Sequence, residues 1–384
     1  MRIAIDAVGI RGHGAAAVLS ELLYWLPIVQ PEWKWHVFLF ERDLREFDDP
    51  VTSDNVKIQY VRDGNTALQR MVWINKILPT HLKQLKADIL FSFANITPIR
   101  PVIPQVVLCH QPNAFFSEGI PWTHVKNKLR FWYMKKQILK GSLASNALIV
   151  QTNAMRDRIL ESDSRLKGRI HVIPSGYRTA SENPITRADI KQLVDNAPKP
   201  RLIYVAHPSE HKNHETLLKA LPHLQKYYPD ISLFLTLDKN KKGDKRYQKF
   251  INKYSMIANN NSTFTNIIWL GILNHDEVTY ALRSSDLSVF PSLAESFGLP
   301  LVESMAAGCP IVASDLTYAH DVCGDAALYF NPKDSRDTAS SITEVLNNKS
   351  LLMKLKAKGE SRKSRFSYEQ IARDYANIFQ KCTS

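Results

Sequence analysis

Short apolar runs alternate with amphipathic segments from one end of the 384-residue chain to the other. Apolar runs of about four to eight residues bounded by turn residues are typical of buried strands. Helical patterns between consecutive strands are the signature of βαβ units around a parallel sheet. The pattern therefore predicts an α/β fold.

The strand pattern occurs in two successive sets. The first set predicts strands at residues 1–8, 35–40, 56–60, 89–92, 105–109, 147–151 and 170–173. A turn with Gly9, Gly12 and Gly14 follows the first of these runs, and an amphipathic helix follows the turn. The second set predicts strands at residues 201–206, 231–237, 267–270, 287–290 and 311–314. Two consecutive sheets imply a cleft between them, with ligands at the carboxyl ends of the strands.

The length of the chain also fits two domains of roughly 150–200 residues each. Residues 179–200 are polar and contain prolines, so we expect a linker there with a short helix inside it. The expected domains are residues 1–178 and 201–365. An amphipathic helix at residues 366–384 ends the chain.

The formal net charge of +13 favours anionic partners: nucleic acid, acidic lipid headgroups or phosphorylated small molecules. No nucleic-acid-binding motif is visible, so we expect no nucleic-acid partner. The four cysteines form no C-x-x-C pair and are expected to be reduced thiols of a cytoplasmic protein. No run approaches the ~20 apolar residues needed to span a bilayer, and the first residues lack a signal-peptide core. Any membrane contact would be peripheral, on the inner face.

Residues 125–145 combine six Lys or Arg side chains with Phe131, Trp132, Tyr133 and Met134. A basic helix with bulky apolar residues is typical of an interfacial helix attracted to anionic lipid. The alternative is a helix that packs its aromatic side chains inward and exposes its lysines to water. The positive net charge favours the membrane interpretation.

The most informative pattern is LSVFPSLAESFGLPLVESMAAGCPIVASD, residues 287–315. It predicts a strand, a loop, a short helix and a second strand. Pro300 suits the first turn of the helix, where its missing N–H would be unpaired anyway. Gly308 suits the C-terminal cap.

The start of this helix has the features of an anion site. Free N–H groups at Phe297, Gly298 and Leu299, together with the helix dipole, suit a diphosphate. Glu303, one turn into the helix, could accept hydrogen bonds from ribose hydroxyls, and Glu295 in the preceding loop would reach a transferred sugar. Alternatively, both glutamates are merely solvated, as is common in the first turn of a helix.

The segment E-S-F-G-L-P-L-V-E resembles the E-x(7)-E motif of the family-4 retaining glycosyltransferases, which have the GT-B fold. The resemblance covers most of the chain and is strongest in KNHETLLKAL, LGILNHDEVTYALRSSDLSVFPS and GDAALYFNPKD. In the first half it depends on the glycine turn, VVLCHQP and RIHVIPSGY. It implies two Rossmann-like domains with a cleft between them and a terminal helix that crosses back to the first domain. It also implies a UDP- or GDP-sugar donor.

The resemblance further implies a role for each matching residue. Glu295 would hold the donor sugar, Glu303 would bind the ribose, and Lys212 would neutralise the diphosphate in place of a metal ion. His110 would face the transferred sugar. Additional donor contacts would come from Gly12, Gly14, Gly271, Ile272 and Leu273.

One position departs from the pattern, because His207 stands where family members often have an arginine. A neutral histidine stabilises a diphosphate less than a guanidinium does. Either His207 is protonated and contacts the phosphates of the donor, or another basic residue such as Arg11 helps, or turnover is modest. His211 and His214 lie nearby, but Lys212 between them would repel a second cation, so we expect no metal site. We expect no other cofactor.

The sequence therefore predicts a metal-independent, retaining glycosyltransferase that transfers a hexose. Residues 201–365 would bind the nucleotide-sugar, and residues 1–178 would bind a glycan or lipid-linked acceptor, as in cell-surface polysaccharide assembly. Two alternatives fit the same fold. One is a non-catalytic subunit that binds a membrane or a partner enzyme, and the other is a sugar-nucleotide epimerase, for which no acid–base carboxylates can be assigned.

Overall fold

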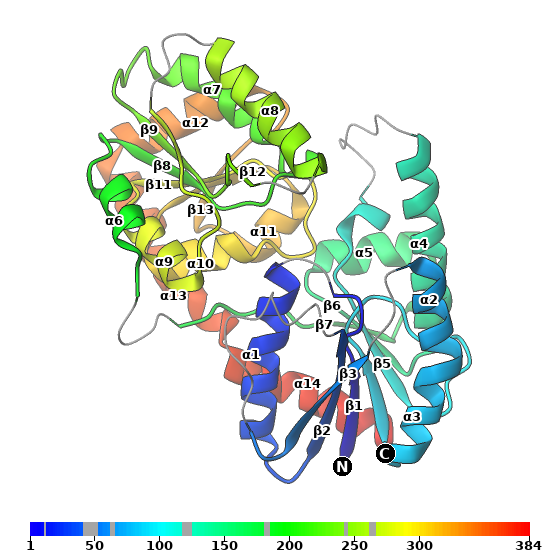
Figure 1. The fold of residues 1–384 in the computed structure, drawn as a ribbon. Coiled ribbons are helices and arrows are strands. Elements are labelled where there is room, and N and C mark those ends of the chain that lie inside the picture. Colours follow the sequence, from blue (N-terminus) through cyan, green and yellow to red (C-terminus); the bar gives the residue numbers. More distant parts are fainter. Residues whose placement is uncertain are drawn as a thin grey trace. The chain divides into compact units, whose positions relative to one another are not determined.

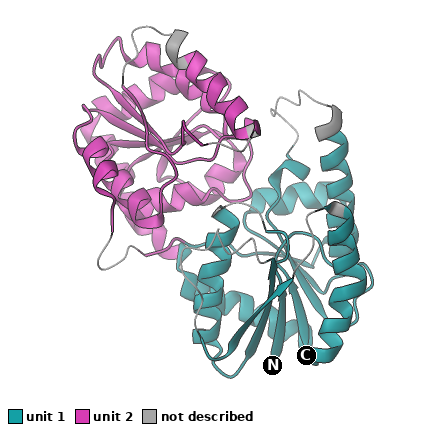
Figure 2. Cartoon of the chain, in the orientation of Figure 1, with its two compact units in different colours: residues 1–117, 122–176, 366–384 teal, residues 118–121, 177–365 magenta. Residues whose placement is uncertain are grey.

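The computed structural model describes residues 1–10, 13–40, 53–61, 66–116, 125–179, 185–241, 245–260 and 266–384. The chain forms two compact units (Figure 2). Unit 1 comprises Met1–Ser117, Trp122–Gly176 and Phe366–Ser384. Unit 2 comprises Tyr177–Arg365. The chain thus returns to unit 1 for its last 19 residues, counted from Phe366 to Ser384.

Unit 1 is built on a seven-stranded parallel sheet with the strand order β3-β2-β1-β4-β5-β6-β7 (Figure 1). Its strands are β1 (Arg2–Asp6), β2 (Lys34–Phe40), β3 (Val56–Val61), β4 (Ile89–Ser92), β5 (Gln105–Cys109), β6 (Ala147–Val150) and β7 (Ile170–Val172). Every residue of β4, β5 and β6 is buried. Strands covered on both faces explain why the sequence shows continuous apolar runs there, without alternation.

Helices accompany the sheet of unit 1 (Figure 1). They are α1 (His13–Val29), α2 (Ala67–Val72), α3 (Leu78–Leu85), α4 (Val125–Leu143), α5 (Asn153–Ser162) and α14 (Tyr368–Thr383). A π-helical turn, Trp73–Ile77, joins α2 to α3 without a break. The predicted first helix is present, but it begins at His13, so Gly14 lies in its first turn and not in the turn before it. Gly12 lies outside the described residues.

A buried carboxylate ends the first strand of unit 1. Asp6 is fully buried and receives two hydrogen bonds from Arg70, at 3.0 and 2.9 Å, and one from Trp73 Nε1 at 3.0 Å. A charge in this position is stable only when it is paired and hydrogen-bonded. These bonds therefore fix α2 and the π-helical turn to the carboxyl end of β1.

Unit 2 has a six-stranded parallel sheet with the order β10-β9-β8-β11-β12-β13. Its strands are β8 (Arg201–Tyr204), β9 (Ser232–Leu235), β10 (Ile267–Trp269), β11 (Leu287–Phe290), β12 (Ile311–Ser314) and β13 (Ala327–Phe330). The first five were expected from the apolar runs. The expected strands did not include β13, which is only four residues long.

The helices of unit 2 surround this sheet (Figure 1). They are α6 (Ala188–Asp195), α7 (His214–Leu224), α8 (Lys245–Asn260), α9 (His275–Arg283), α10 (Leu299–Ala307), α11 (Thr317–Cys323), α12 (Ser335–Asn347) and α13 (Lys349–Lys363). Helix α6 lies in the segment read from the sequence as a linker. Its Ile190 and Val194 are buried against Ile203 and Phe234, so α6 contributes to the core of unit 2.

The terminal helix α14 packs in unit 1 against α1 and the sheet. Phe379 is fully buried, with ring centroids 5.2 Å from Phe91 on β4 and 6.4 Å from Trp35 on β2. Tyr375 lies 5.5 Å from Phe91 by the same measure. These aromatic side chains join the last residues of the chain to strands near its beginning.

Phe379→Ala is expected to destabilise unit 1 by about 3–5 kcal/mol, because it removes a buried ring and leaves a cavity. The measurement is the thermal melting of the full chain, in which the unit 1 transition should shift to lower temperature. The matched control is Gln380→Ala, on the exposed side of the same helix turn, which should stay within about 0.5 kcal/mol. Equal shifts in both variants would show that α14 is not part of the core.

Candidate functional site

The loops after β8 and β11 lie at the point where the strand order of unit 2 reverses direction. In open α/β sheets this switch point is where ligands bind, at the carboxyl ends of the strands. Lys212 closes a short 3-10 turn, Glu210–Lys212, after β8, and Glu295 lies in the loop after β11. Because β8 and β11 are neighbours, the two loops meet.

Lys212 and Glu295 form an ion pair between these loops. Lys212 Nζ lies 2.6 Å from Glu295 Oε1, and their side chains are only 16% and 10% exposed. Ser292 Oγ donates a second hydrogen bond to the same carboxylate oxygen, at 2.6 Å. The structure thus brings together two of the three residues that the sequence predicted to be catalytic.

Main-chain contacts hold the pair in place. The N–H of Leu293 donates to the carbonyl oxygen of His211 at 2.7 Å. Tyr204 Oη donates to the carbonyl oxygen of Lys212 at 2.6 Å, and Tyr318 Oη donates to that of Ser292 at 2.7 Å. Both tyrosines are buried, so they support the loops from inside the unit.

Asn213 links three loops of unit 2. Its backbone has the left-handed conformation, with φ 51°, which asparagine tolerates better than most residues. Its Nδ2 donates to the carbonyl oxygens of Pro291, at 3.1 Å after β11, and Pro332, at 2.7 Å after β13. Neither Asn213 nor the tyrosines were predicted as site residues; Asn213 lies in the KNHETLLKAL segment, but no role was assigned to it.

The surroundings of Glu295 keep it ionised. Burial acts to raise the pKa of this carboxyl, but the charge of Lys212, the proximity of His211 and the hydrogen bonds from Lys212 and Ser292 outweigh it, so the pKa lies below its usual value. An ionised carboxylate therefore lies against the Lys212 side chain. Glu295 can accept hydrogen bonds from a sugar, and Lys212 can share its charge with a phosphate.

Helix α10 begins next to Glu295 with the predicted signals. Gly298 is the N-cap with φ 94°, a conformation that strains any residue with a Cβ, and proline occupies the first turn. Gly308 caps the other end with φ 71°. No side chain caps the N-terminus of α10, so its dipole and first-turn N–H groups favour an anion there. Phe297 is buried just before the cap.

Glu303 has the opposite surroundings to Glu295. It is half-buried on α10 and makes no hydrogen bond or ion pair with the other described residues. Burial alone raises the pKa of its carboxyl to about 7. A half-buried carboxyl without a partner costs stability, and such groups concentrate at binding sites.

The remaining predicted donor residues of unit 2 lie on other loops. His207, after β8, is exposed, and its ring lies 5.6 Å from that of Tyr247. Gly271 follows β10 with φ 77°. The carbonyl oxygen of Ile272 accepts a hydrogen bond from Arg187 at 3.2 Å, so it is already engaged, and Leu273 packs against the core.

The histidines near Lys212 do not converge. His214 is fully buried between Tyr204 and Tyr254, with ring centroids 4.7 and 4.9 Å away, and burial lowers its pKa to about 3. His207 is exposed. Within the described ranges, no group of three or more His, Cys, Asp or Glu side chains could hold a metal ion.

His110 and Gly14 belong to unit 1. His110 follows β5, is half-buried, and burial lowers its pKa to about 4. Gly14 is exposed on α1. The residues of unit 2 described above belong to one compact unit, and His110 and Gly14 belong to the other.

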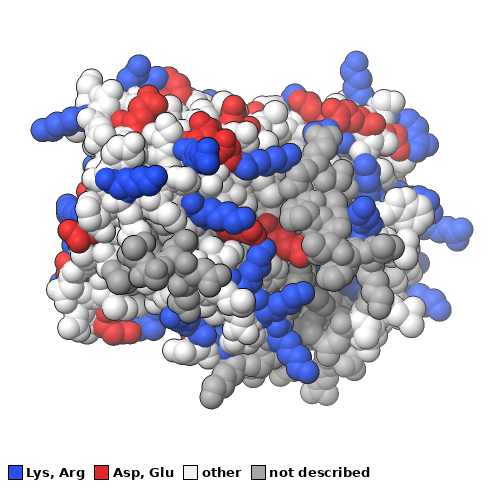
Figure 3. All heavy atoms as spheres, turned by 90° about the horizontal axis from the view of Figure 1, so that it is seen from above, with Lys and Arg blue, Asp and Glu red and all other residues white. Residues whose placement is uncertain are grey.

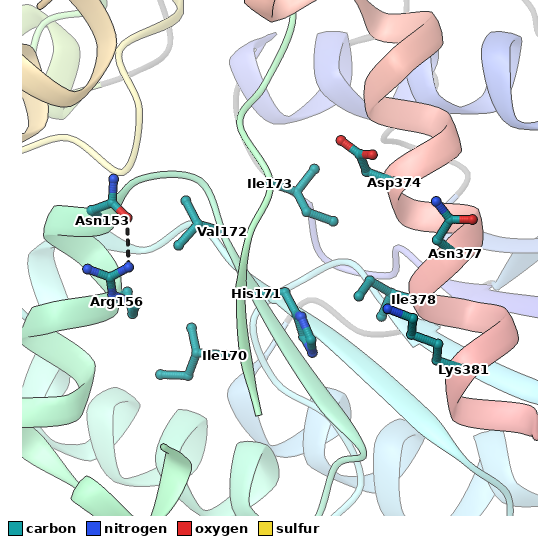
Figure 4. A pocket seen from close by; sticks show the side chains of 10 residues that line it. All are labelled: Asn153, Arg156, Ile170, His171, Val172, Ile173, Asp374, Asn377, Ile378 and Lys381. Atoms are coloured by element: carbon teal, nitrogen blue, oxygen red, sulfur yellow. Dashed lines mark hydrogen bonds between the residues drawn. The ribbon is translucent and has the colours of Figure 1, made fainter. Parts of the chain in front are cut away.

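Unit 1 also has a surface pocket of about 460 Å³ between β7, α5 and α14 (Figure 4). Basic side chains of Arg156, His171 and Lys381 line it together with Asp374. Arg156 donates a hydrogen bond to Asn153 at 2.8 Å. None of the predicted donor residues lines this pocket.

Among the helices described, none has both the length and the apolarity that crossing a bilayer requires. The four cysteines are free thiols.

Comparisons with solved structures agree with this architecture. Sucrose-phosphate synthase from Thermosynechococcus elongatus superposes with a TM-score of 0.75 at 17% identity, covering 99% of this chain and 98% of that one. WaaG, a glycosyltransferase involved in lipopolysaccharide biosynthesis, gives 0.72 at 13% identity, covering 98% and 99%. Anabaena HepE in complex with UDP and glucose gives 0.72 at 16% identity, covering 99% and 100%. The fold is therefore the GT-B fold of glycosyltransferases.

The amino-acid sequence was also compared with protein families and with known proteins. Residues 186–362 match the model of the family described as glycosyl transferases group 1. O-antigen chain mannosyltransferase B of Escherichia coli is 31% identical over 114 residues, which are 30% of this chain and 30% of the relative. Serotype-specific mannosyltransferase WbdA of Escherichia coli is 26% identical over 235 residues, 60% of this chain and 26% of the relative. The matches thus span less than a third of these relatives.

Glu303→Gln is expected to stabilise the ligand-free protein, and more at pH 8 than at pH 5. The folded carboxyl keeps its proton up to about pH 7, whereas the unfolded one releases it near the ordinary pKa of 4.5. The folded state therefore binds more protons between these values, so the free energy of unfolding falls as the pH rises through this window and stays low above it. Glutamine does not ionise, so the free energy of unfolding of the variant does not fall in this way.

The measurement is the melting temperature at the two pH values. Glu344→Gln, on the exposed side of α12, is the control and should change the melting temperature equally at both. A Glu303→Gln variant without a larger gain at pH 8 would contradict the unpaired, half-buried state of this carboxyl.

Proposed function

We propose that the chain is a metal-independent, retaining glycosyltransferase that moves a sugar from a UDP- or GDP-sugar to a hydroxyl of a glycan or lipid-linked glycan. The observation that carries the proposal is the buried Lys212–Glu295 pair beside the uncapped N-terminus of α10. The names of the mannosyltransferase relatives and of WaaG support a role in cell-surface polysaccharide assembly.

In this proposal, the diphosphate of the donor lies between Lys212 and the start of α10. As the bond between the anomeric carbon and the phosphate oxygen breaks, negative charge grows on that oxygen. A fixed ammonium and a helix N-terminus that face the oxygen stabilise this charge without reorganising. Lys212 therefore supplies the charge that a metal ion would supply elsewhere.

Glu295 has two tasks in the same step. It orients Lys212 through the 2.6 Å ion pair. It also accepts hydrogen bonds from hydroxyls of the transferred sugar. Glu303, which has no partner among the described residues, binds the ribose hydroxyls of the nucleotide, and ribose binding offsets the cost of burying that carboxyl.

The chemistry proposed is front-face transfer. The acceptor hydroxyl attacks the anomeric carbon on the side that the phosphate leaves, and its proton passes to a phosphate oxygen. This route retains the configuration and requires no nucleophilic carboxylate. His110 of unit 1 is assigned to the transferred sugar.

Glu295→Gln and Lys212→Met are each expected to lower kcat/KM at least ~30-fold. This corresponds to a loss of about 2 kcal/mol of transition-state stabilisation. The assay follows nucleotide release from the sugar donor that binds most tightly in a titration of UDP- and GDP-sugars. Running it in EDTA should leave the rate unchanged. Lys219→Met, which breaks an exposed ion pair with Glu215 on α7, is the matched control and should keep normal turnover.

Near-normal turnover of both site variants would refute the site assignment, and activity restored only by Mn²⁺ after EDTA would refute the metal-free mechanism. If no nucleotide-sugar binds at all, the proposal of an enzyme fails in favour of a non-catalytic subunit.

We also propose that the exposed side of α4 contacts an anionic membrane surface, which would suit a lipid-linked acceptor. Leu129, Trp132 and Tyr133 are 65%, 52% and 49% exposed. Their spacing places them on one stripe of the helix. Lys136 continues the stripe one turn on, with its ammonium 3.8 Å from the Trp132 ring centroid.

The apolar stripe is surrounded by exposed positive charge. Lys128, Arg130 and Lys140 are all exposed on the same helix. On the face drawn in Figure 3, by contrast, Lys and Arg are interspersed with Asp and Glu and do not form one large patch. Exposed aromatic side chains flanked by lysines are what distinguishes α4 as an interfacial helix.

Charge reversal at Lys128, Lys136 and Lys140 is expected to lower co-sedimentation with vesicles that contain anionic lipid by at least about tenfold, since each basic residue near the surface contributes about 1 kcal/mol. The control reverses Lys349, Lys354 and Lys356, which are exposed on α13 and give the same change in net charge. Equal losses in both triple variants would mean that net charge alone, and not α4, attracts the vesicles.

A further inference from the structure

Asn95 has an unusual backbone and two contacts with His110. It lies in the loop after β4, with φ 68°, in the left-handed region. Its Oδ1 accepts a hydrogen bond from the backbone N–H of His110 at 2.8 Å. Its Nδ2 lies 3.2 Å from Nε2 of the His110 ring. One side chain therefore binds both the backbone and the ring of the histidine that follows β5.

The first contact determines the orientation of the amide. A backbone N–H can only donate, so the amide atom that faces it must be the oxygen. The other amide atom, Nδ2, then faces the ring, and an amide nitrogen can only donate. The ring nitrogen Nε2 must therefore be an acceptor without a proton. In a neutral imidazole the proton then resides on Nδ1.

A protonated ring does not fit this arrangement. An imidazolium would direct its Nε2–H at the N–H₂ group of Asn95, donor against donor. Burial acts in the same direction, because it lowers the pKa of His110 to about 4. Phe93, fully buried, packs against the imidazole with ring centroids 5.5 Å apart, which restricts the ring to this orientation.

A buried network fixes the loop that carries Asn95. Ser92 Oγ donates to Thr97 Oγ1 at 2.8 Å, and Thr97 Oγ1 donates to Gln105 Oε1 at 2.9 Å. Gln105 Nε2 donates back to the carbonyl oxygen of Pro98 at 2.9 Å. Gly141 of α4 supports the loop from behind, where an added Cβ would lie 2.9 Å from Thr97 Cγ2. Satisfied buried networks of this kind rigidify their surroundings.

We propose that Asn95 is a positioning residue that holds His110 as the neutral tautomer with its proton on Nδ1. The ring then presents Nδ1–H as a hydrogen-bond donor to a ligand, while Nε2 is occupied by Asn95 and closed to proton transfer. Nδ1 makes no hydrogen bond within the described part of the chain.

If the chain has the proposed function, the tautomer of His110 limits what this side chain can do in transfer. A neutral Nδ1–H can donate to a sugar hydroxyl, but His110 cannot act as the general base that deprotonates the acceptor. It would bind and orient the sugar. The proton of the acceptor then has to go elsewhere, as front-face transfer requires.

The experiment is ¹⁵N NMR of the full chain labelled at histidine, at neutral pH. The chain has 12 histidines, and the signals of His110 are those lost in His110→Gln. In the wild type, Nε2 should give the shift of an unprotonated nitrogen and Nδ1 that of a protonated one. In Asn95→Asp a carboxylate oxygen replaces the amide nitrogen Nδ2 that faces the ring. This oxygen can only accept a hydrogen bond, so Nε2 should become protonated.

Asn95→Gly separates the amide from the backbone conformation, since glycine adopts the positive φ without strain. It should give a mixture of the two tautomers in a folded protein. A protonated Nε2 in the wild type, or an unprotonated one in Asn95→Asp, would overturn the proposal.

Turnover distinguishes this inference from the proposed function. With His110 on the sugar, Asn95→Asp should lower kcat/KM about tenfold. A changed tautomer with normal turnover would support the inference about Asn95 and contradict the role of His110 in transfer.

Discussion

Oppositely charged side chains that are largely removed from water require each other and further hydrogen bonds. In unit 2 these side chains are Lys212 and Glu295, and most of the site serves to hold the pair together. Ser292 binds the carboxylate, Tyr204 holds the carbonyl group of Lys212, and the two loops bond to each other through Leu293. The pair carries no net charge. The contacts of the pair thus fix the position of the Lys212 side chain.

Much of this architecture follows from the sequence. The parallel strands are fully buried and therefore appear as continuous apolar runs, and the start and end of α10 are marked by Pro300 and Gly308. The fold class, two α/β units, was confirmed. Strand β13 was not among the expected strands; it lies at the edge of the sheet, and its two middle residues are only half-buried, whereas β11 and β12 are fully buried. Gly14 was placed in a turn because glycine favours turns, but here it begins a helix.

The residues that position the site could not be predicted. Asn213 and Asn95 act by a left-handed backbone and by amide contacts with loops that are distant in sequence, and neither property leaves a local signal. The ion pair of Lys212 with Glu295 also depends on β8 and β11 being neighbours, although 83 residues separate the two side chains. The E-x(7)-E spacing drew attention to the two glutamates but did not predict that their surroundings differ. One is paired and ionised, whereas the other is unpaired with a raised pKa.

In both units an asparagine holds a loop at the carboxyl edge of the sheet. In a parallel sheet, the loops at the carboxyl edge have no strand ladder to hold them, since the ladder ends where the loops begin. An asparagine in the left-handed conformation turns the chain sharply and offers its amide to a neighbouring loop. Asn95 does so after β4, and Asn213 does so after β8.

The return of the chain into unit 1 affects how the protein is made. The ribosome releases strands β1–β7 first, then all of unit 2 from Tyr177 to Arg365, and only afterwards α14. Until α14 emerges, Phe91 and Trp35 lack the aromatic side chains that cover them in the finished protein. Nascent unit 1 thus exposes an apolar face while unit 2 is being synthesised. Unit 2 can fold as a unit before α14 has been made. Chaperones act on exposed faces of this kind during synthesis.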